Sequence, residues 1–251
     1  MDSESVARLI RDRFEAVPPK GLLVVSDFDG TISEVVDEPA RARLLPEAGQ
    51  ALQRLVPLVL RVAVISGRPG EFLRSQIPLA GVILRGNYGQ SGVTHEEGLR
   101  LERFNHEAGD RIRGRAGVWL ELKPASTSIH FRSQPDAGRD LLQRLTPLAH
   151  GHDLLIRRGR MVLEVMLPPA DKGRTLDQLM NEMHPDGVLF AGDDSGDVAA
   201  FERMGSFTVP HLSVGVASPE VDVGTFASCD LIVDGPRALA FFLSRLADWA
   251  A

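Results

Sequence analysis

Residues 22–31 read Leu22-Leu23-Val24-Val25-Ser26-Asp27-Phe28-Asp29-Gly30-Thr31, an apolar run that ends in two carboxylates. The apolar run has the length and composition of a buried strand in a parallel sheet. Such a strand would carry Asp27 and Asp29 to its carboxyl end, where open α/β sheets bind ligands. If the pleat continues, both acids share one face. Clustered carboxylates need a cation or a shifted pKa, so the stretch predicts a reactive site; a helix N-cap followed by a surface acid is the structural alternative.

The pattern on both sides of this stretch alternates between helices and strands. Buried strands are expected at 61–65, 82–84, 188–191, 213–216 and 231–233, and helices at 5–17, 47–56, after Asp171 and at 238–249. Strands that alternate with helices imply right-handed crossovers and a parallel sheet. The sequence therefore predicts an α/β fold with a doubly wound parallel-sheet core.

Residues 92–168 follow a different pattern, with a helix, alternating strands, a second helix and two more strands. Apolar residues are spaced by two along each expected strand, which is typical of a half-buried antiparallel sheet. The alternating sets are Val118, Leu120 and Leu122 against Trp119, Glu121 and Lys123; Ile129 and Phe131 against Ser128, His130 and Arg132; and Met161, Leu163 and Val165 against Val162, Glu164 and Met166. We therefore expect a smaller α+β domain at 92–168, inserted into a core formed by 1–91 and 169–251.

Composition excludes several classes of protein. The 251 residues carry a net charge of −6, which argues against a general nucleic-acid binder, although a local positive pocket could still hold an anionic substrate. The single cysteine, Cys229, forbids an intrachain disulfide and fits a reducing compartment. No apolar stretch has the length of a membrane span, and the first residues lack a signal-peptide pattern. We expect a cytoplasmic protein with no membrane or nucleic-acid partner, either a monomer or a weak oligomer.

Polar residues gather where the predicted strands end and one helix begins. They are Asp27 and Asp29, Ser66, Lys172, and Asp193 with Asp194 and Asp197. Oxygen ligands in this number suit Mg²⁺, and Lys172 would lie inside a helix that Asp171 caps, facing an anion. Each residue also has a structural alternative: Ser66 as a turn residue, Lys172 as a solvated lysine, Asp194 as a support for Asp193, and Asp197 as a helix cap.

The order of these motifs resembles the haloacid dehalogenase-like phosphohydrolases, which carry an Asp-x-Asp-Gly-Thr motif, a later Ser or Thr, a Lys and an acidic pair. That family has a cap domain inserted between the Ser and Lys motifs. The resemblance implies that Asp27 is the nucleophile and forms an aspartyl-phosphate, while Asp29 protonates the leaving group and then activates water. It also implies that Asp27, the Asp29 carbonyl and Asp193 hold Mg²⁺, and that Ser66 and Lys172 hold the phosphoryl oxygens. Asp194 and Asp197 would support the metal ligands, and Arg68 would reach the phosphate or pair with a surface acid.

Within that superfamily, the chain most closely resembles the trehalose-6-phosphate phosphatases, in both the core and the inserted domain. The matching stretches are 35–40, Glu121-Leu122-Lys123 with 124–132, and 159–165 followed by Asp171-Lys172-Gly173. This resemblance implies that Glu121, Lys123 and Glu164 contact the distal glucose. Strand periodicity independently places Glu121 and Lys123 on one polar face, which Glu164 can share from another strand. A salt-bridge ladder on a solvated sheet is the alternative. Two roles are left open for three further residues, either a contact with the substrate or a purely structural role: His130, Arg132 and Asn87.

Two stretches of the sequence depart from the pattern of that family. The last motif reads Gly192-Asp193-Asp194-Ser195-Gly196-Asp197-Val198, where the family has Thr and Glu in place of Gly196 and Val198. Met166-Leu167 replaces a frequent Arg-Pro. These changes leave the core acids intact but weaken the assignment of the substrate.

Together these features predict a Mg²⁺-dependent phosphatase acting on trehalose 6-phosphate, with its site in the cleft between core and cap. A phosphatase for another phosphorylated sugar or glycoside, such as sucrose phosphate or mannosylglycerate phosphate, remains open, as does a catalytically silent sugar-phosphate sensor. A signalling receiver domain uses similar acids, but it lacks both the second acid of the Asp-x-Asp pair and an insertion of this size.

Overall fold

The computed structural model describes residues 2–36, 41–89, 93, 95–123, 125–159, 161–168, 171–219 and 221–251. The chain divides into two compact units, one formed by residues 1–90 and 170–251 and the other by 91–169. The expected domain limits at 91/92 and 168/169 include Ser91, Gly92 and Pro169, which lie outside the described residues. Parts of the quoted resemblance, namely 37–40, Pro124 and Arg160, also lie outside them.

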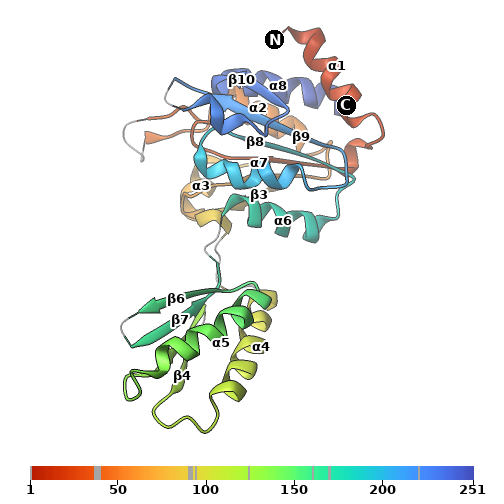
Figure 1. Cartoon of the computed structure of the whole chain (residues 1–251). Helices are drawn as coiled ribbons and strands as arrows, with labels where there is room; N and C mark the ends of the chain where they lie inside the picture. The colour runs from red at the N-terminus through yellow and green to blue at the C-terminus, as the bar shows by residue number, and fades with distance from the viewer. Residues whose placement is uncertain are drawn as a thin grey trace. The chain divides into compact units, whose positions relative to one another are not determined.

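The first unit is built on a six-stranded parallel sheet in the order β10-β9-β8-β1-β2-β3 (Figure 1). Its strands are β1 (Leu22–Ser26), β2 (Arg61–Ile65), β3 (Val82–Arg85), β8 (Gly187–Gly192), β9 (His211–Ala217) and β10 (Leu231–Asp234). Its helices are α1 (Ser3–Phe14), α2 (Pro46–Leu55), α3 (Gly70–Gln76), α6 (Lys172–Met183), α7 (Val198–Met204) and α8 (Gly235–Ala250). The predicted parallel core is confirmed, while α3 was not predicted and α1 ends at Phe14 rather than residue 17.

Strand β1 is buried on both faces because its side chains alternate between two hydrophobic cores. Leu22 and Val24 join the core packed against α1, α2 and α8. Leu23 and Val25 join the core packed against α6 and α7 on the opposite face. This arrangement explains the uninterrupted apolar run, and it puts the carboxyl end of β1 between β2 and β8 in the middle of the sheet.

The second unit packs two helices on a four-stranded antiparallel sheet in the order β4-β5-β7-β6. Its elements are α4 (His95–Ile112), β4 (Trp119–Leu122), β5 (Ser126–His130), α5 (Ala137–Gly151), β6 (Leu155–Gly159) and β7 (Val162–Met166). Ile129, Leu163 and Val165 lie on the sheet face that packs against the helices. The predicted half-buried antiparallel sheet is therefore confirmed.

Three details of the predicted alternation are wrong. Strand β5 ends at His130, so Arg132 is an exposed residue beyond the strand rather than a member of its polar face. Met161 precedes β7 with a φ of 63° and is partly exposed, so it does not belong to the buried face. Leu122, at the end of edge strand β4, is 63% exposed. Each error falls at a strand end, where the period-two pattern stops applying.

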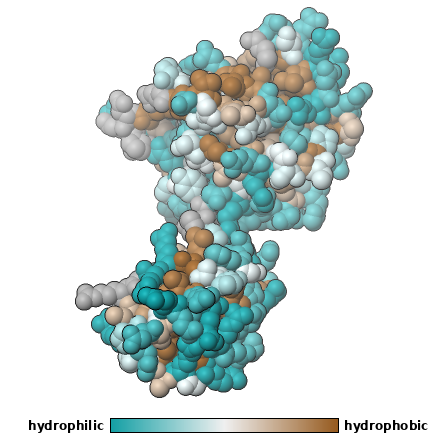
Figure 2. Space-filling view, in the orientation of Figure 1, coloured by the Kyte–Doolittle hydropathy of each residue, from teal (hydrophilic) through white to brown (hydrophobic). Residues whose placement is uncertain are grey.

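The visible surface of both units is mostly hydrophilic, with hydrophobic residues in smaller patches (Figure 2). Among the described residues, no helix is long and apolar enough to cross a membrane.

Candidate active site

The chain turns sharply after β1, and this turn separates Asp27 from Asp29. The Asp27 amide donates to the carbonyl of Ala191 on β8 at 2.8 Å, so strand pairing reaches one residue past β1. The amides of Ile32 and Ser33 then both donate to the Phe28 carbonyl at 3.0 Å, which closes a compact loop. The pleat does not continue past Asp27, so the condition under which both acids would share one strand face is not met.

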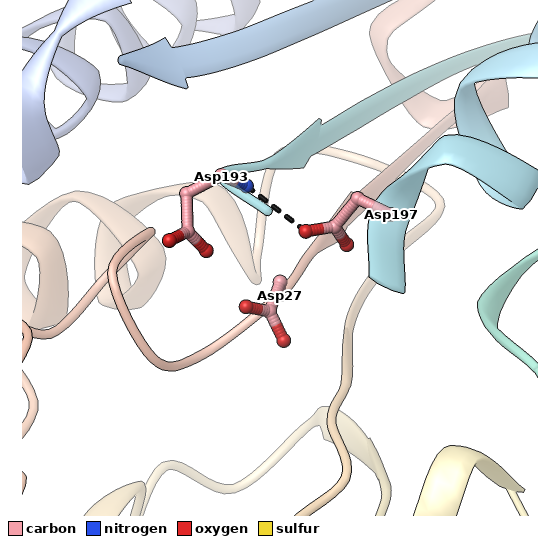
Figure 3. A group of neighbouring side chains, drawn as sticks. All are labelled: Asp27, Asp193 and Asp197. Atoms are coloured by element: carbon pink, nitrogen blue, oxygen red, sulfur yellow. Dashed lines mark hydrogen bonds between the residues drawn. The ribbon is translucent and has the colours of Figure 1, made fainter. Parts of the chain in front are cut away.

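Three buried carboxylates meet at this end of the sheet. Asp27 follows β1, Asp193 follows β8, and Asp197 ends the short 3₁₀ helix η4 (Ser195–Asp197). One carboxylate oxygen from each lies within 4.8 Å of the others, and Figure 3 shows the three side chains around a common space. Thr31, from the loop after β1, donates its hydroxyl to Asp193 at 3.0 Å. Two strand ends and a helical turn thus converge on one acidic centre.

Lys172 supplies the positive charge of this centre. It is the first residue of α6, whose N-cap Asp171 accepts a hydrogen bond from the Arg174 amide. Its Nζ lies 2.9 Å from Asp27 Oδ1 and donates to Asp197 Oδ1 at 2.7 Å. Only 3% of Lys172 is exposed, so it is not a solvated lysine at a helix start.

The acidic motif after β8 organises itself through backbone hydrogen bonds. Asp197 Oδ2 accepts from the amides of Asp193 and Asp194, at 2.9 and 3.1 Å. Asp194 in turn accepts from the Gly196 amide at 2.8 Å and caps η4. Asp197 therefore connects Lys172 to the loop that positions Asp193, while the more exposed Asp194 shapes the turn.

Burial shifts the pKa of all three acids upward. It raises the pKa of Asp27 to about 7 against the attraction of Lys172. Burial, together with the neighbouring acids, also raises the pKa of Asp193 and of Asp197 to about 7. Burial opposes the charged form of Lys172, but Asp27 and Asp197 still raise the pKa of that ammonium above its ordinary value. Near neutral pH, the three carboxylates carry more negative charge than the ammonium group of Lys172 balances. The cluster therefore fits a hard divalent cation such as Mg²⁺.

Asp29 forms a separate pair with Arg68. The guanidinium donates from Nε to Asp29 Oδ2 at 2.7 Å and from Nη2 to Asp29 Oδ1 at 2.6 Å, a two-pronged contact. The hydrogen bond to Asp29 also raises the pKa of Arg68. Arg68 lies over the Phe72 ring, 4.8 Å from its centroid. Of the two roles predicted for Arg68, a phosphate contact or a pair with a surface acid, the structure shows an ion pair, and its partner is the second acid of the Asp-x-Asp pair.

Ser66 lies at the end of β2 in a turn that a second segment holds in place. Strand β2 pairs with β1, so Ser66 follows the strand end next to Asp27. Ser66 is buried, and its Oγ accepts from the Arg68 amide at 3.2 Å. The amides of Asn87 and Tyr88 donate to the carbonyls of Arg68 and Ser66, both at 2.8 Å. Asn87 therefore contacts this turn through its backbone.

Sequence reasoning missed two residues of this site, Thr31 and Tyr88. Tyr88 and Asn87 have φ values of 57° and 51°, an uncommon left-handed conformation for residues with side chains. The Tyr88 hydroxyl lies against Gly67, where a Cβ would be 2.7 Å away. Two features of the sequence could have pointed to these residues. Thr31 belongs to the first motif, and Tyr88 is the only tyrosine of the chain and lies between Gly86 and Gly89.

In the second unit, the structure brings Glu121, Lys123 and His130 together on the sheet face turned away from the helices. Glu121 Oε2 lies 2.9 Å from His130 Nε2 and 3.7 Å from Lys123 Nζ. The hydrogen bond with His130, helped by Lys123, lowers the pKa of Glu121. Lys123 also donates to Ser128 Oγ at 2.9 Å. These contacts are compatible with both a sugar-binding face and a salt-bridge ladder.

Glu164 extends this polar row. Ser128 on β5 lies opposite Glu121 on one side and opposite Glu164 on the other. Opposed residues of antiparallel strands project from the same face, so Glu164 shares the face of Glu121. Arg132 does not, because it lies beyond the end of β5.

The chain is similar in sequence to several known proteins. The family model for trehalose-phosphatase matches residues 25–231. A trehalose-phosphate phosphatase of Mycobacterium tuberculosis is 29% identical over 244 residues, covering 89% of this chain and 61% of its own length. An uncharacterized glycosyl hydrolase of the same species is 30% identical over 245 residues, again 89% of this chain but 18% of its own. The chain thus spans less than two thirds of the length of these curated relatives.

Solved structures with the same fold include two fungal proteins. The trehalose-6-phosphate phosphatase of Aspergillus fumigatus superposes with a TM-score of 0.62 at 19% identity, covering 99% of this chain and 98% of the other. The C-terminal domain of the Candida albicans trehalose-6-phosphate phosphatase gives a TM-score of 0.56 at 19% identity, covering 96% of each chain. At this level of identity the likeness establishes the fold.

Proposed function

Because this chain belongs to the trehalose-phosphatase family, we propose that it is a Mg²⁺-dependent phosphatase that hydrolyses trehalose 6-phosphate to trehalose and phosphate. The observation that supports this most directly is the buried group of Asp27, Asp193 and Asp197 around Lys172 at the end of β1. Burying three acids beside one ammonium costs free energy, through repulsion between the acids and through their desolvation. This cost indicates a functional role rather than an ordinary ion-pair cluster.

In this proposal Asp27 attacks phosphorus through a carboxylate oxygen while the bond from phosphorus to the sugar oxygen breaks. Asp29 gives its proton to the departing sugar oxygen. Water then attacks the aspartyl-phosphate, Asp29 takes a proton from that water, and the phosphorus–Asp27 bond breaks to release phosphate. In this proposal Arg68 moves from Asp29 to a phosphoryl oxygen of the substrate, which frees the Asp29 oxygens to carry and transfer the proton.

The remaining residues of the core unit bind charge. Lys172 and Ser66 would hold the phosphoryl oxygens, and Asp27, the Asp29 carbonyl and Asp193 would hold Mg²⁺. When bound, the ion neutralises charge on the transferring phosphoryl group. Asp197 is already occupied by Lys172 and two backbone amides, which favours a supporting role over direct ligation.

We assign recognition of the sugar to Glu121, Lys123 and Glu164. They lie on one sheet face, and they offer hydroxyl groups both acceptors and a donor. His130 orients Glu121 and contributes through that contact. A phosphatase for another phosphorylated disaccharide or glycoside would use the same core residues. Met166, which shares the face of Glu164, is the position where we expect a different substrate to be selected.

The test is phosphate release with trehalose 6-phosphate, sucrose 6-phosphate, glucose 6-phosphate, mannosylglycerate phosphate and p-nitrophenyl phosphate. We expect trehalose 6-phosphate to give the highest kcat/KM, EDTA to abolish release, and added Mg²⁺ to restore it. Metal-dependent release that favours another phosphate would overturn the substrate and keep the chemistry. Binding of the sugar phosphates without any release would instead indicate a sensor.

A further inference from the structure

Trp119 is an exposed aromatic residue that the hydrophobic core of its own unit does not use. It opens edge strand β4 and is 53% exposed. The buried core of this unit forms from residues on the other face of the sheet, such as Ile129, Leu163 and Val165. The indole therefore offers an apolar surface that the core of its own unit does not cover.

The indole is held flat against a neighbouring ring. Trp119 lies opposite His130 in the β4–β5 pairing, and the two rings stack with centroids 4.2 Å apart and an interplanar angle of 16°. His130 Nε2 in turn lies 2.9 Å from Glu121 Oε2. One face of the indole is therefore covered by an imidazole that Glu121 orients, which limits the motion of the exposed ring.

The register places this ring beside the polar row. Trp119 and Glu121 are two residues apart on β4, so they share a face and lie roughly 7 Å apart along the strand. Ser128 and Glu164 continue the row of Glu121 on the next two strands of the sheet. The indole therefore projects from the same sheet face as this row of charged and hydroxyl groups, next to Glu121 along β4.

Hexose rings match such a surface, because they carry apolar C–H faces and hydroxyl groups around the rim. We infer that Trp119 is a specificity-determining residue whose exposed ring packs against the C–H face of a glucose unit while Glu121 and Lys123 bind its hydroxyls. The inference rests on the proposed function and deepens it. The apolar contact favours the disaccharide phosphate over phosphate esters without a sugar, since only a sugar reaches both the ring and the polar row.

The first test compares Trp119→Ala with Leu122→Ala, which removes a somewhat more exposed apolar residue from the opposite face of the same strand. We expect Trp119→Ala to raise the KM for trehalose 6-phosphate by about five- to tenfold, in line with the usual strength of ring stacking, with KM for p-nitrophenyl phosphate unchanged. Trp119→Phe should recover part of the loss. An unchanged KM for trehalose 6-phosphate, or equal losses on both substrates, overturns the inference.

The second test needs no substitution at position 119. The chain has two tryptophans, and Trp249 packs beside Phe14 in the other unit, so Trp249→Phe leaves Trp119 as the only source of indole fluorescence. Trehalose should protect Trp119 from quenching by acrylamide in a saturable way, whereas unprotected fluorescence at saturating trehalose overturns the inference. If neither phosphate ester is hydrolysed, the proposed function fails, and this titration still decides whether Trp119 contacts sugar.

Discussion

Two opposing effects set the pKa of Asp27: burial of its carboxyl group raises it, and the ammonium group of Lys172 lowers it. Asp27 is almost fully buried, its pKa is raised to about 7 by that burial, and Lys172 lies 2.9 Å away. A side chain in this environment is costly to the fold, which is typical of residues retained for chemistry.

Replacing Asp27 by Asn should abolish turnover, because an amide cannot form the phosphoenzyme. Folding should survive, since Asn keeps the shape of the side chain and Lys172 retains Asp197 as a partner. Phosphate release and circular dichroism measure the two effects, with exposed Asp12→Asn as the control. Near-normal activity in Asp27→Asn would contradict the assignment of the nucleophile.

Glu121 differs from Asp27 because its proposed task is recognition. Glu121→Ala should lower kcat/KM for trehalose 6-phosphate by about ten- to a hundredfold, the usual range for a lost hydrogen bond to a charged group. The loss on p-nitrophenyl phosphate should be much smaller, because that ester offers no sugar hydroxyls. Exposed Glu102→Ala, on α4 of the same unit, serves as the control. Equal losses on both substrates would refute a role in sugar recognition.

At the scale of elements, the loop after β1 is built around Gly30. This glycine has a φ of 71°, and a Cβ there would lie 2.0 Å from Asp193 Oδ2. The backbone of the first motif thus approaches the acid after β8 more closely than any side chain permits. The Gly of the Asp-x-Asp-Gly motif is needed for both its conformation and its contact.

Gly30→Ala should therefore reduce both stability and activity. The left-handed backbone alone costs about 1–2 kcal/mol in the free energy of unfolding, and displacement of Asp193 should weaken Mg²⁺ binding. Chemical denaturation and the Mg²⁺ dependence of phosphate release measure the two effects. Gly205→Ala is the matched control, because that glycine lacks a positive φ and its nearest neighbouring atom is 3.7 Å away. A variant as stable and as responsive to Mg²⁺ as Gly205→Ala would contradict this view of the loop.

At the scale of the whole molecule, the acidic cluster links stability to pH and metal. Asp27, Asp193 and Asp197 have folded-state pKa values raised to about 7, above the value of about 3.9 for an unfolded chain. Between these values the folded state binds more protons than the unfolded state. Without metal, these groups therefore stabilise the fold at pH 4, and that stability is lost as pH rises towards 7.

Thermal denaturation in EDTA should show this loss as a Tm that falls from pH 5 to pH 7.5, with Mg²⁺ restoring the Tm at the higher pH. The shift should occur in the unit that carries the acids, because each unit has its own hydrophobic core. In Trp119→Phe, the fluorescence of Trp249 on α8 reports that unit alone. Asp193→Asn should reduce the response to Mg²⁺, and a Tm indifferent to Mg²⁺ at pH 7.5 would argue against a metal site.

Local periodicity was enough to predict much of this molecule. The apolar run of β1, the alternation of helices and strands, and the shared face of Glu121 and Lys123 follow from repeats of 3.6 and 2 residues, which depend only on neighbours in the chain. The order of the acidic and basic motifs indicated the family. Strand ends were the exception, as Arg132 and Met161 illustrate, because a ladder stops where its partner strand stops.

Tertiary structure decided which charges meet. Asp29 and Arg68 pair across two loops, Asp197 shares Lys172 with Asp27, and Trp119 stacks on His130 from an adjacent strand. No local sequence pattern predicts these contacts, because each depends on the order of strands in a sheet and on where the chain turns after a strand. Burial, which raises the pKa of the acids, likewise arises only when both faces of the central sheet are covered.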